Sequence, residues 1–98
     1  MNIRIFDDEN GVMNKSILDV GGEILSISQF TLQATTKDGN RPSYINAMKG
    51  DDAIKLYEEF NRELSKSVKT FPGVFGAEME VNIVNDGPIT IVIDSKNK

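Results

Sequence analysis

The chain has 98 residues, of which 39% are hydrophobic and 27% charged, a composition that predicts one small globular domain. Its net charge of -4 argues against a protein that coats nucleic acid by bulk electrostatics, because such proteins carry a basic stripe or face. A local tRNA contact stays possible. The sequence contains no cysteine and no histidine, which excludes disulfides, thiol nucleophiles, imidazole bases and the usual zinc ligand sets.

The start of the chain favours a cytoplasmic protein. Residues 1–6 do not form a basic segment followed by an apolar run, as a secretory leader would. No stretch approaches the roughly 20 apolar residues that span a bilayer, so we expect no membrane segment.

The first third of the sequence predicts two strands joined by irregular chain. Residues 2–6 alternate apolar and polar side chains, and residues 7–11 end in Asn-Gly, which is typical of a turn. Residues 12–20 are mixed and predict an irregular or short extended segment. Residues 23–32 predict a central strand with polar side chains gathered at its end, where they could meet a ligand.

The remainder of the sequence predicts a loop, a helix and a hairpin. Residues 33–50 are polar and rich in turn residues, and a loop this long is either functional or a mobile surface insertion. Apolar residues spaced by three and four predict a helix over residues 51–69, with Asp51 as a candidate cap. Two alternating segments, 77–83 and 89–94, flank a turn and predict a hairpin.

These elements predict an α+β fold. We expect residues 1–98 to form a single domain with a mostly antiparallel, barrel-like sheet and one main amphipathic helix over about residues 51–69.

Few side chains in this sequence can carry covalent chemistry. The available nucleophiles are hydroxyls such as Ser28 and Thr31, which are weak without a base nearby. Asp7, Asp8 and Glu9 could bind a divalent cation, but their position beside Asn-Gly favours a solvated turn. We therefore predict no metal site and no cofactor.

Four motifs, in order along the chain, resemble those of the D-aminoacyl-tRNA deacylase family. Two are similar to its signature motifs, Ser28-Gln29-Phe30-Thr31-Leu32 and Asn85-Asp86-Gly87-Pro88-Ile89-Thr90. Between them lie two further similar segments, Arg41-Pro42-Ser43-Tyr44 and Phe75-Gly76-Ala77-Glu78-Met79. The resemblance covers essentially the whole chain, and it implies that residues 1–98 correspond to the carboxy-terminal two thirds of such an enzyme.

The first signature motif implies the reaction centre. By this resemblance Ser28, Gln29, Phe30 and Thr31 line a pocket for the adenosine and the ester, and backbone N–H groups near Phe30 and Thr31 stabilise the oxyanion. Thr31 is either a nucleophile or a positioning group. We favour positioning, because no base is available to activate its hydroxyl and the 2′-hydroxyl of the substrate could orient the attacking water.

The second signature motif implies a chirality filter. Gly87 and Pro88, joined by a cis bond, would project their carbonyl oxygens into the pocket of a partner subunit and hold the substrate amino group. From periodicity alone, an ordinary trans turn is the simpler reading. Met79 would lie beside the pocket, although core packing is an equal alternative for an alternating methionine.

The function implied is chiral proofreading in translation. A cytoplasmic homodimer would bind the 3′-terminal aminoacyl-adenosine of D-aminoacyl-tRNA, or of mischarged glycyl-tRNA, and hydrolyse its ester. The alternatives are an inactive truncated remnant and a small-molecule binding module that self-associates.

Overall fold

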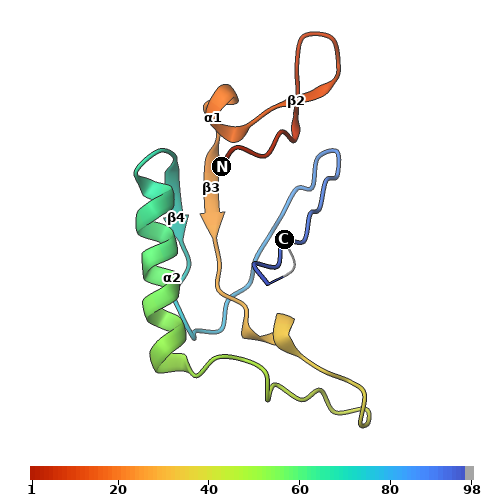
Figure 1. Cartoon of the computed structure of the whole chain (residues 1–98), viewed down its shortest axis with the longest axis vertical. Coiled ribbons are helices and arrows are strands. Elements are labelled where there is room, and N and C mark those ends of the chain that lie inside the picture. Colours follow the sequence, from red (N-terminus) through yellow and green to blue (C-terminus); the bar gives the residue numbers. More distant parts are fainter. Residues whose placement is uncertain (97–98) are drawn as a thin grey trace.

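A computed structural model describes residues 1–96. The first elements form a small amino-terminal unit: β1 (Phe6–Asp7) pairs antiparallel with β2 (Met13–Lys15), and the short helix α1 (Ile17–Val20) follows. In Figure 1 this unit lies at one end of the elongated molecule, above the start of the next strand.

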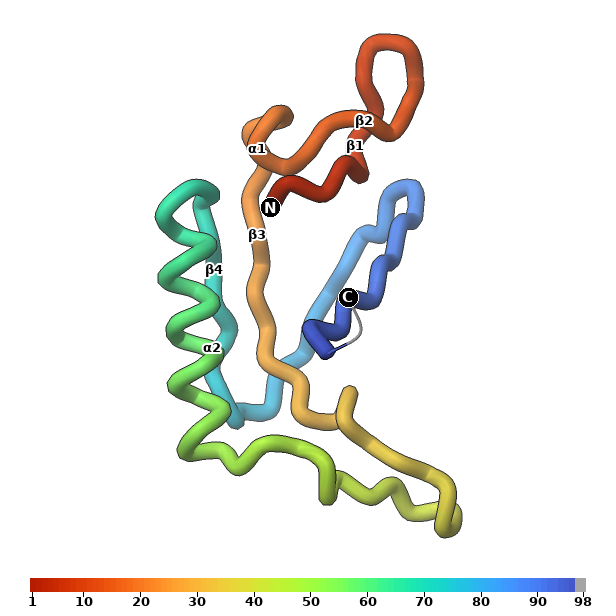
Figure 2. Tube along the Cα trace, in the orientation of Figure 1, coloured from red at the N-terminus to blue at the C-terminus, as the bar shows by residue number. Residues whose placement is uncertain are grey.

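A β-α-β unit forms the main body of the structure. Strands β3 (Glu23–Ser26) and β4 (Lys69–Pro72) pair in parallel, from Glu23 opposite Lys69 to Ser26 opposite Pro72. Parallel strands need a long crossover connection, and helix α2 (Gly50–Ser65) supplies part of it. The helix runs beside β4, and the long loop that precedes it extends away at the other end of the molecule (Figures 1 and 2).

The structure confirms the α+β class and the single main helix but corrects the predicted sheet. The pairing beside the helix is parallel, and the described residues form no closed barrel. In the part of the chain that the structure describes, no strand follows β4. The segment predicted as a hairpin, residues 77–94, turns back on itself without a strand ladder (Figure 2). Alternating apolar residues indicate extended chain, but they do not specify a pairing partner.

The strand predicted over residues 23–32 is also shorter than expected. Pairing stops at Ser26, and a 3₁₀ helix, η1 (Phe30–Gln33), occupies the end of the predicted strand. Ser26 lies opposite Pro72, and the last backbone bond of this pair runs from the Gly73 N–H to Ser26 O at 2.9 Å. Beyond this bond the chain after Ser26 leaves the sheet as irregular structure.

Helix α2 begins one residue before its predicted start and ends four residues before its predicted end. Asp51 lies in the first turn, where an acidic side chain favours the helix dipole, whereas the capping position belongs to Lys49, whose side chain makes no capping bond. After the helix, the Val68 backbone N–H still bonds to Leu64 O at 2.9 Å, and the Val68 side chain is buried.

The described chain has a very small apolar core. Among residues 1–96, Val68 is the one hydrophobic residue that is buried, at 5% exposure. The radius of gyration is 16.0 Å, compared with about 13 Å for a compact domain of this length. No helix in the described residues is long and apolar enough to cross a membrane.

A capping box stabilises α1, in the segment for which the sequence predicted irregular structure. The Ser16 backbone N–H donates to Asp19 Oδ2 at 2.9 Å, and the Asp19 backbone N–H donates to Ser16 Oγ at 3.3 Å. The hydrogen bond from the Ser16 backbone, followed by that from its hydroxyl, lowers the pKa of the Asp19 carboxyl below its ordinary value of 3.8. This reciprocal pair fixes the chain immediately before β3.

We expect Ser16→Ala to lower the free energy of unfolding by about 1 kcal/mol at neutral pH, because α1 loses its cap. The lowered pKa of Asp19 means that its contribution is complete above the ordinary pKa and is lost as the pH falls through the lowered one. The difference between wild type and variant should therefore shrink in acid. Urea denaturation at several pH values measures it.

Ser67→Ala is the matched control, because Ser67 is exposed in the turn after α2. Equal stability of Ser16→Ala and Ser67→Ala at neutral pH would show that the capping box does not stabilise the fold.

Candidate functional site

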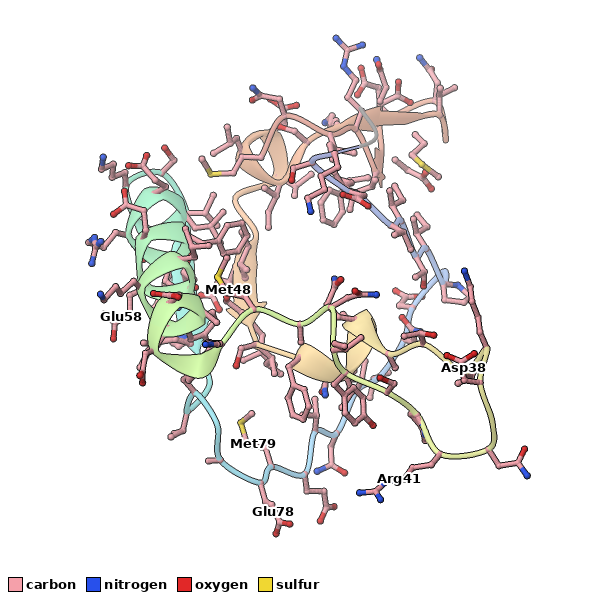
Figure 3. The ribbon with its side chains drawn as sticks, turned by 60° about the horizontal axis from the view of Figure 1, so that its bottom comes forward. Asp38, Arg41, Met48, Glu58, Glu78 and Met79 are labelled. Carbon is pink, nitrogen blue, oxygen red and sulfur yellow. The ribbon has the colours of Figure 1, made fainter. Side chains whose placement is uncertain are left out.

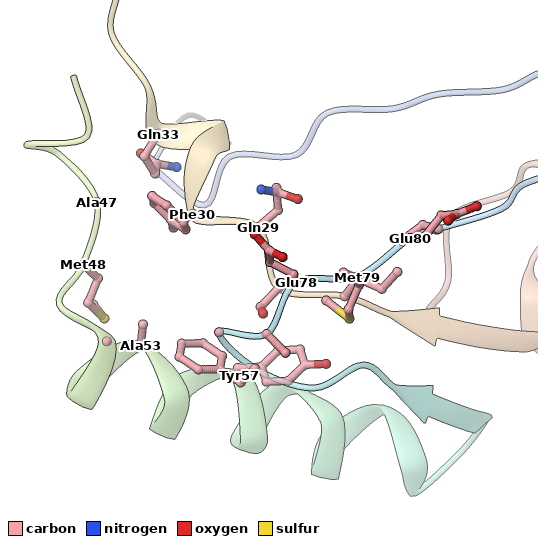
Figure 4. Close-up of a pocket in the computed structure, with 17 residues that line it drawn as sticks. Gln29, Phe30, Gln33, Ala47, Met48, Ala53, Tyr57, Glu78, Met79 and Glu80 are labelled. Carbon is pink, nitrogen blue, oxygen red and sulfur yellow. The ribbon is translucent and has the colours of Figure 1, made fainter. Parts of the chain in front are cut away.

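The candidate site is an open pocket at the ends of β3 and β4, beside the first turns of α2. Its volume is about 1120 Å³, slightly above the usual range for small-molecule sites. Figure 4 shows Gln33 and Phe30 on one side of it, with Met48 and Ala53 across from them. The lining comprises Ile27, Ser28, Gln29, Phe30, Gln33, Ala47, Met48, Gly50, Ala53, Tyr57, Phe75, Gly76, Ala77, Glu78, Met79, Glu80 and Val81.

The chain leaving β3 forms one wall of the pocket. Ser28, Gln29 and Phe30, three of the residues that the first signature motif proposed for the reaction centre, all lie in this lining. Thr31 is not a lining residue, but its Oγ1 accepts a hydrogen bond from Gln29 Nε2. The Phe30 ring meets Tyr44 edge to face, with 5.0 Å between ring centroids, which ties this wall to the long loop.

The chain leaving β4 forms the second wall. Met79 lies in the lining, where the sequence allowed either a pocket or a core position. A Cβ added to Gly73 would lie 3.1 Å from Met79 Sδ and 3.7 Å from Ile27 Cγ1. Gly73 therefore lets Met79 approach the chain that follows β3.

The second signature motif lies outside this pocket. Gly87 and Pro88 are absent from its lining, so the structure does not bring them together with Ser28, Gln29 and Phe30. The bond between them is cis, and Gly87 has φ 116°, which side-chain-bearing residues rarely adopt.

Sequence reasoning missed the most connected side chain of the site, Tyr57. Its hydroxyl donates to Ser26 O at 2.7 Å and accepts from the Gly73 backbone N–H at 3.1 Å. On the same helix, Asn61 Oδ1 accepts from Ser26 Oγ at 2.6 Å. Tyr57 fitted the apolar spacing of the helix, and the only available signal was that an inward-facing tyrosine hydroxyl requires a hydrogen-bond partner.

The polar side chains of the lining include the amides of Gln29 and Gln33 and the hydroxyls of Ser28 and Tyr57. Two carboxylates, Glu78 and Glu80, also line the pocket, whereas its described lining includes no lysine or arginine. Asp38 and Arg41 extend from the long loop (Figure 3). Within residues 1–96, no group of three or more aspartate and glutamate side chains is placed to hold a metal ion. The amide, hydroxyl and carboxylate groups that line the pocket can orient a polar substrate through hydrogen bonds.

Comparisons with known proteins identify the family. The family model described as D-Tyr-tRNA(Tyr) deacylase matches residues 1–94. The chain belongs to the D-aminoacyl-tRNA deacylase family. A D-aminoacyl-tRNA deacylase of Bacteroides fragilis strain YCH46 is 64% identical, over 100% of this chain and 67% of its own length. One from Flavobacterium psychrophilum is 59% identical over the same shares.

A solved structure supports the fold of this deacylase-family chain. The structure titled c-Myc DNA Unwinding Element Binding Protein is 43% identical, with a TM-score of 0.86, and the match covers 96% of this chain and 65% of the other. The chain thus spans about two thirds of the length of the relatives it matches.

We expect Gly73→Ala to move Met79, because the added methyl group would lie 3.1 Å from its sulfur. The flexible methionine can yield, so we predict a shifted Met79 methyl resonance and a change in unfolding free energy below about 1 kcal/mol. Methyl NMR and urea denaturation measure the two effects.

Gly50→Ala is the matched control, because a Cβ there meets nothing within 4 Å. The Met13 resonance provides an internal reference at the other end of the molecule. An unmoved Met79 resonance in Gly73→Ala would contradict the close contact between Gly73 and Met79.

Proposed function

We propose that this protein hydrolyses the ester of D-aminoacyl-tRNA and of mischarged glycyl-tRNA, releasing the free amino acid and tRNA. The observation that carries the proposal is the pocket formed by Ser28, Gln29 and Phe30 with Met79, in a chain that belongs to the deacylase family. The pocket has room for a terminal aminoacyl-adenosine, and its amides and backbone groups suit recognition by hydrogen bonds.

The proposed chemistry uses water and backbone donors. Water attacks the ester carbonyl carbon, the carbonyl oxygen becomes an oxyanion, and the bond to the ribose oxygen then breaks as that oxygen takes a proton. Phe30 and Thr31 begin η1, and the first N–H groups of a helix have no partner within it. These groups are the proposed oxyanion donors, with the substrate's 2′-hydroxyl orienting the water.

Within this scheme Thr31 positions rather than attacks. Its hydroxyl is engaged by the Gln29 amide, and the sequence provides no histidine to remove its proton. A threonine hydroxyl without a base is a weak nucleophile. Thr31 instead holds Gln29 in place at the first wall of the pocket.

Selection of the D-isomer is assigned to Gly87 and Pro88, acting across a homodimer. The two residues lie outside the pocket of their own chain, which is consistent with a role in a partner's pocket. Their segment also carries apolar side chains that a subunit interface could cover: Val84 is 97% exposed and Val92 is 91% exposed. If the Gly87 and Pro88 carbonyl oxygens bind the substrate amino group, the side chain of an L-amino acid would point into the backbone and be rejected.

The complete fold and its cellular setting belong to the same proposal. Residues 1–98 form a single unit that corresponds to the carboxy-terminal two thirds of a deacylase. Residues 77–94 are extended but contribute no strand to the described sheets. They are therefore available to pair with residues outside this segment in a barrel-like antiparallel sheet. The enzyme acts on tRNA in the cytoplasm.

The alternative functions have less support. An inactive remnant or a small-molecule binding module is not favoured by 64% identity to a protein named as a deacylase. The solved relative is titled as a DNA-element binding protein, but the net charge of -4 does not favour duplex DNA binding by this chain.

The purified protein should release D-tyrosine from D-Tyr-tRNA and leave L-Tyr-tRNA intact. We expect Gly87→Ala to lower the rate on D-Tyr-tRNA about tenfold or more, because φ 116° imposes strain of about 1–3 kcal/mol on a residue with a Cβ. Release of radiolabelled tyrosine measures both rates.

Gly11→Ala is the matched control for strain, since Gly11 also has a positive φ and lies outside the pocket lining. It should hydrolyse D-Tyr-tRNA at the wild-type rate. Absence of D-specific release by the wild-type protein would refute the proposed function.

We expect Thr31→Val to reduce kcat/KM about tenfold, because one neutral hydrogen bond at Gln29 is lost. Removal of a true nucleophile instead lowers kcat by about 10⁶-fold. Single-turnover deacylation with excess enzyme separates the two outcomes, and Thr36→Val, outside the pocket lining, is the matched control. A loss close to that of a nucleophile would overturn the positioning role.

A further inference from the structure

We propose that Tyr57 is a positioning residue for substrate binding: its hydroxyl fixes the separation of the two walls of the pocket. The first wall follows Ser26, the last residue of β3, and the second follows Gly73, directly after β4. This inference rests on the proposed deacylase function and assigns a role to a residue of α2.

The hydroxyl of Tyr57 lies where the two walls diverge. It donates to Ser26 O at 2.7 Å and accepts from the Gly73 N–H at 3.1 Å. The same Gly73 N–H also donates to Ser26 O at 2.9 Å. Three polar groups, from β3, α2 and the chain after β4, therefore meet at one point.

The strand ladder supplies one bond at this point. Its last pair joins Ser26 to Pro72, and the outermost bond of that pair runs from the Gly73 N–H to Ser26 O. Beyond this pair the two chains separate, one toward Gln29 and Phe30 and the other toward Met79. The tyrosine hydroxyl thus reinforces the junction at which the sheet opens into the pocket.

Two other contacts keep the hydroxyl in place. The Tyr57 ring packs on Phe75, a residue of the second wall, with 5.8 Å between centroids at a tilt of 39°. One helical turn further on, Asn61 Oδ1 accepts the Ser26 hydroxyl at 2.6 Å. Residues four apart lie on the same helix face, so α2 holds Ser26 through both its carbonyl and its side chain.

The consequence for the proposed reaction is a pocket of defined width. Tyr57 itself lines the pocket (Figure 4), but it acts through Ser26 and Gly73 rather than on the ester. Without the hydroxyl, the first wall, which carries Ser28 and Gln29, can shift relative to Met79 on the second. A substrate held between two walls binds more weakly when their separation is no longer fixed.

Tyr57→Phe tests this inference, because it keeps the aromatic packing and removes only the hydroxyl. We expect KM for D-Tyr-tRNA to rise about three- to tenfold, as expected from the loss of one hydrogen bond. The Kd of a non-hydrolysable, amide-linked D-tyrosyl-adenosine analogue should rise by a similar factor. Steady-state deacylation and calorimetric titration of the purified protein measure the two quantities.

Stability must be separated from positioning, because reversible unfolding raises the apparent Kd in inverse proportion to the folded fraction. Urea denaturation of Tyr57→Phe gives that fraction, and the increase in KM and Kd should exceed what it accounts for. Glu59→Gln is the control on the same helix: Glu59 pairs with Arg62 on the exposed surface, and KM should stay at the wild-type value.

Unchanged KM and Kd in Tyr57→Phe would overturn the inference even if the wild-type protein is an active deacylase. If the wild-type protein binds the analogue without hydrolysing the ester, the proposed function fails, and the Kd comparison alone decides the role of Tyr57. If it neither hydrolyses nor binds, both proposals fall.

Discussion

The hydrogen bonds that converge on Ser26 determine the arrangement of the pocket. Its carbonyl accepts from Tyr57 and Gly73, and its hydroxyl donates to Asn61. The described chain has little apolar burial to fix its elements in place. Directional polar contacts therefore determine how α2 lies against the end of β3, and with it where the chain from Ser28 onward begins.

Elements set by interactions between residues close in sequence could be predicted, and those set by residues distant in sequence could not. The main helix could be predicted because its spacing of three and four is a local property of residues 51–65. The end of β3 could not, because it depends on where pairing with β4 stops, and the partner of Ser26 in the sheet, Pro72, is 46 positions away in sequence. The alternation in residues 77–94 likewise indicated an extended conformation without specifying a partner.

The residues of the site likewise differ in whether the sequence could reveal them. Motif resemblance proposed Ser28, Gln29, Phe30, Thr31 and Met79 for the site, because each motif is contiguous in sequence. All of these except Thr31 line the pocket. The resemblance did not reveal Tyr57, which belongs to an amphipathic pattern where its ring fits as well as that of phenylalanine. The resemblance proposed Gly87 and Pro88 for the pocket of a partner subunit, and the structure places them outside the pocket of their own chain.

The absence of histidine and cysteine from the sequence gives this polar framework a particular importance for the proposed reaction. Where a strong base or nucleophile is present, its reactivity can dominate the rate. Where water, a substrate hydroxyl and backbone N–H groups do the work, the barrier depends on how accurately these groups are held. In the proposed scheme a side chain that touches no reacting atom, such as Tyr57, acts on substrate binding through the position of the backbone. The same reasoning applies to stereoselection, because an L-side chain is rejected by carbonyl groups only if they cannot move aside.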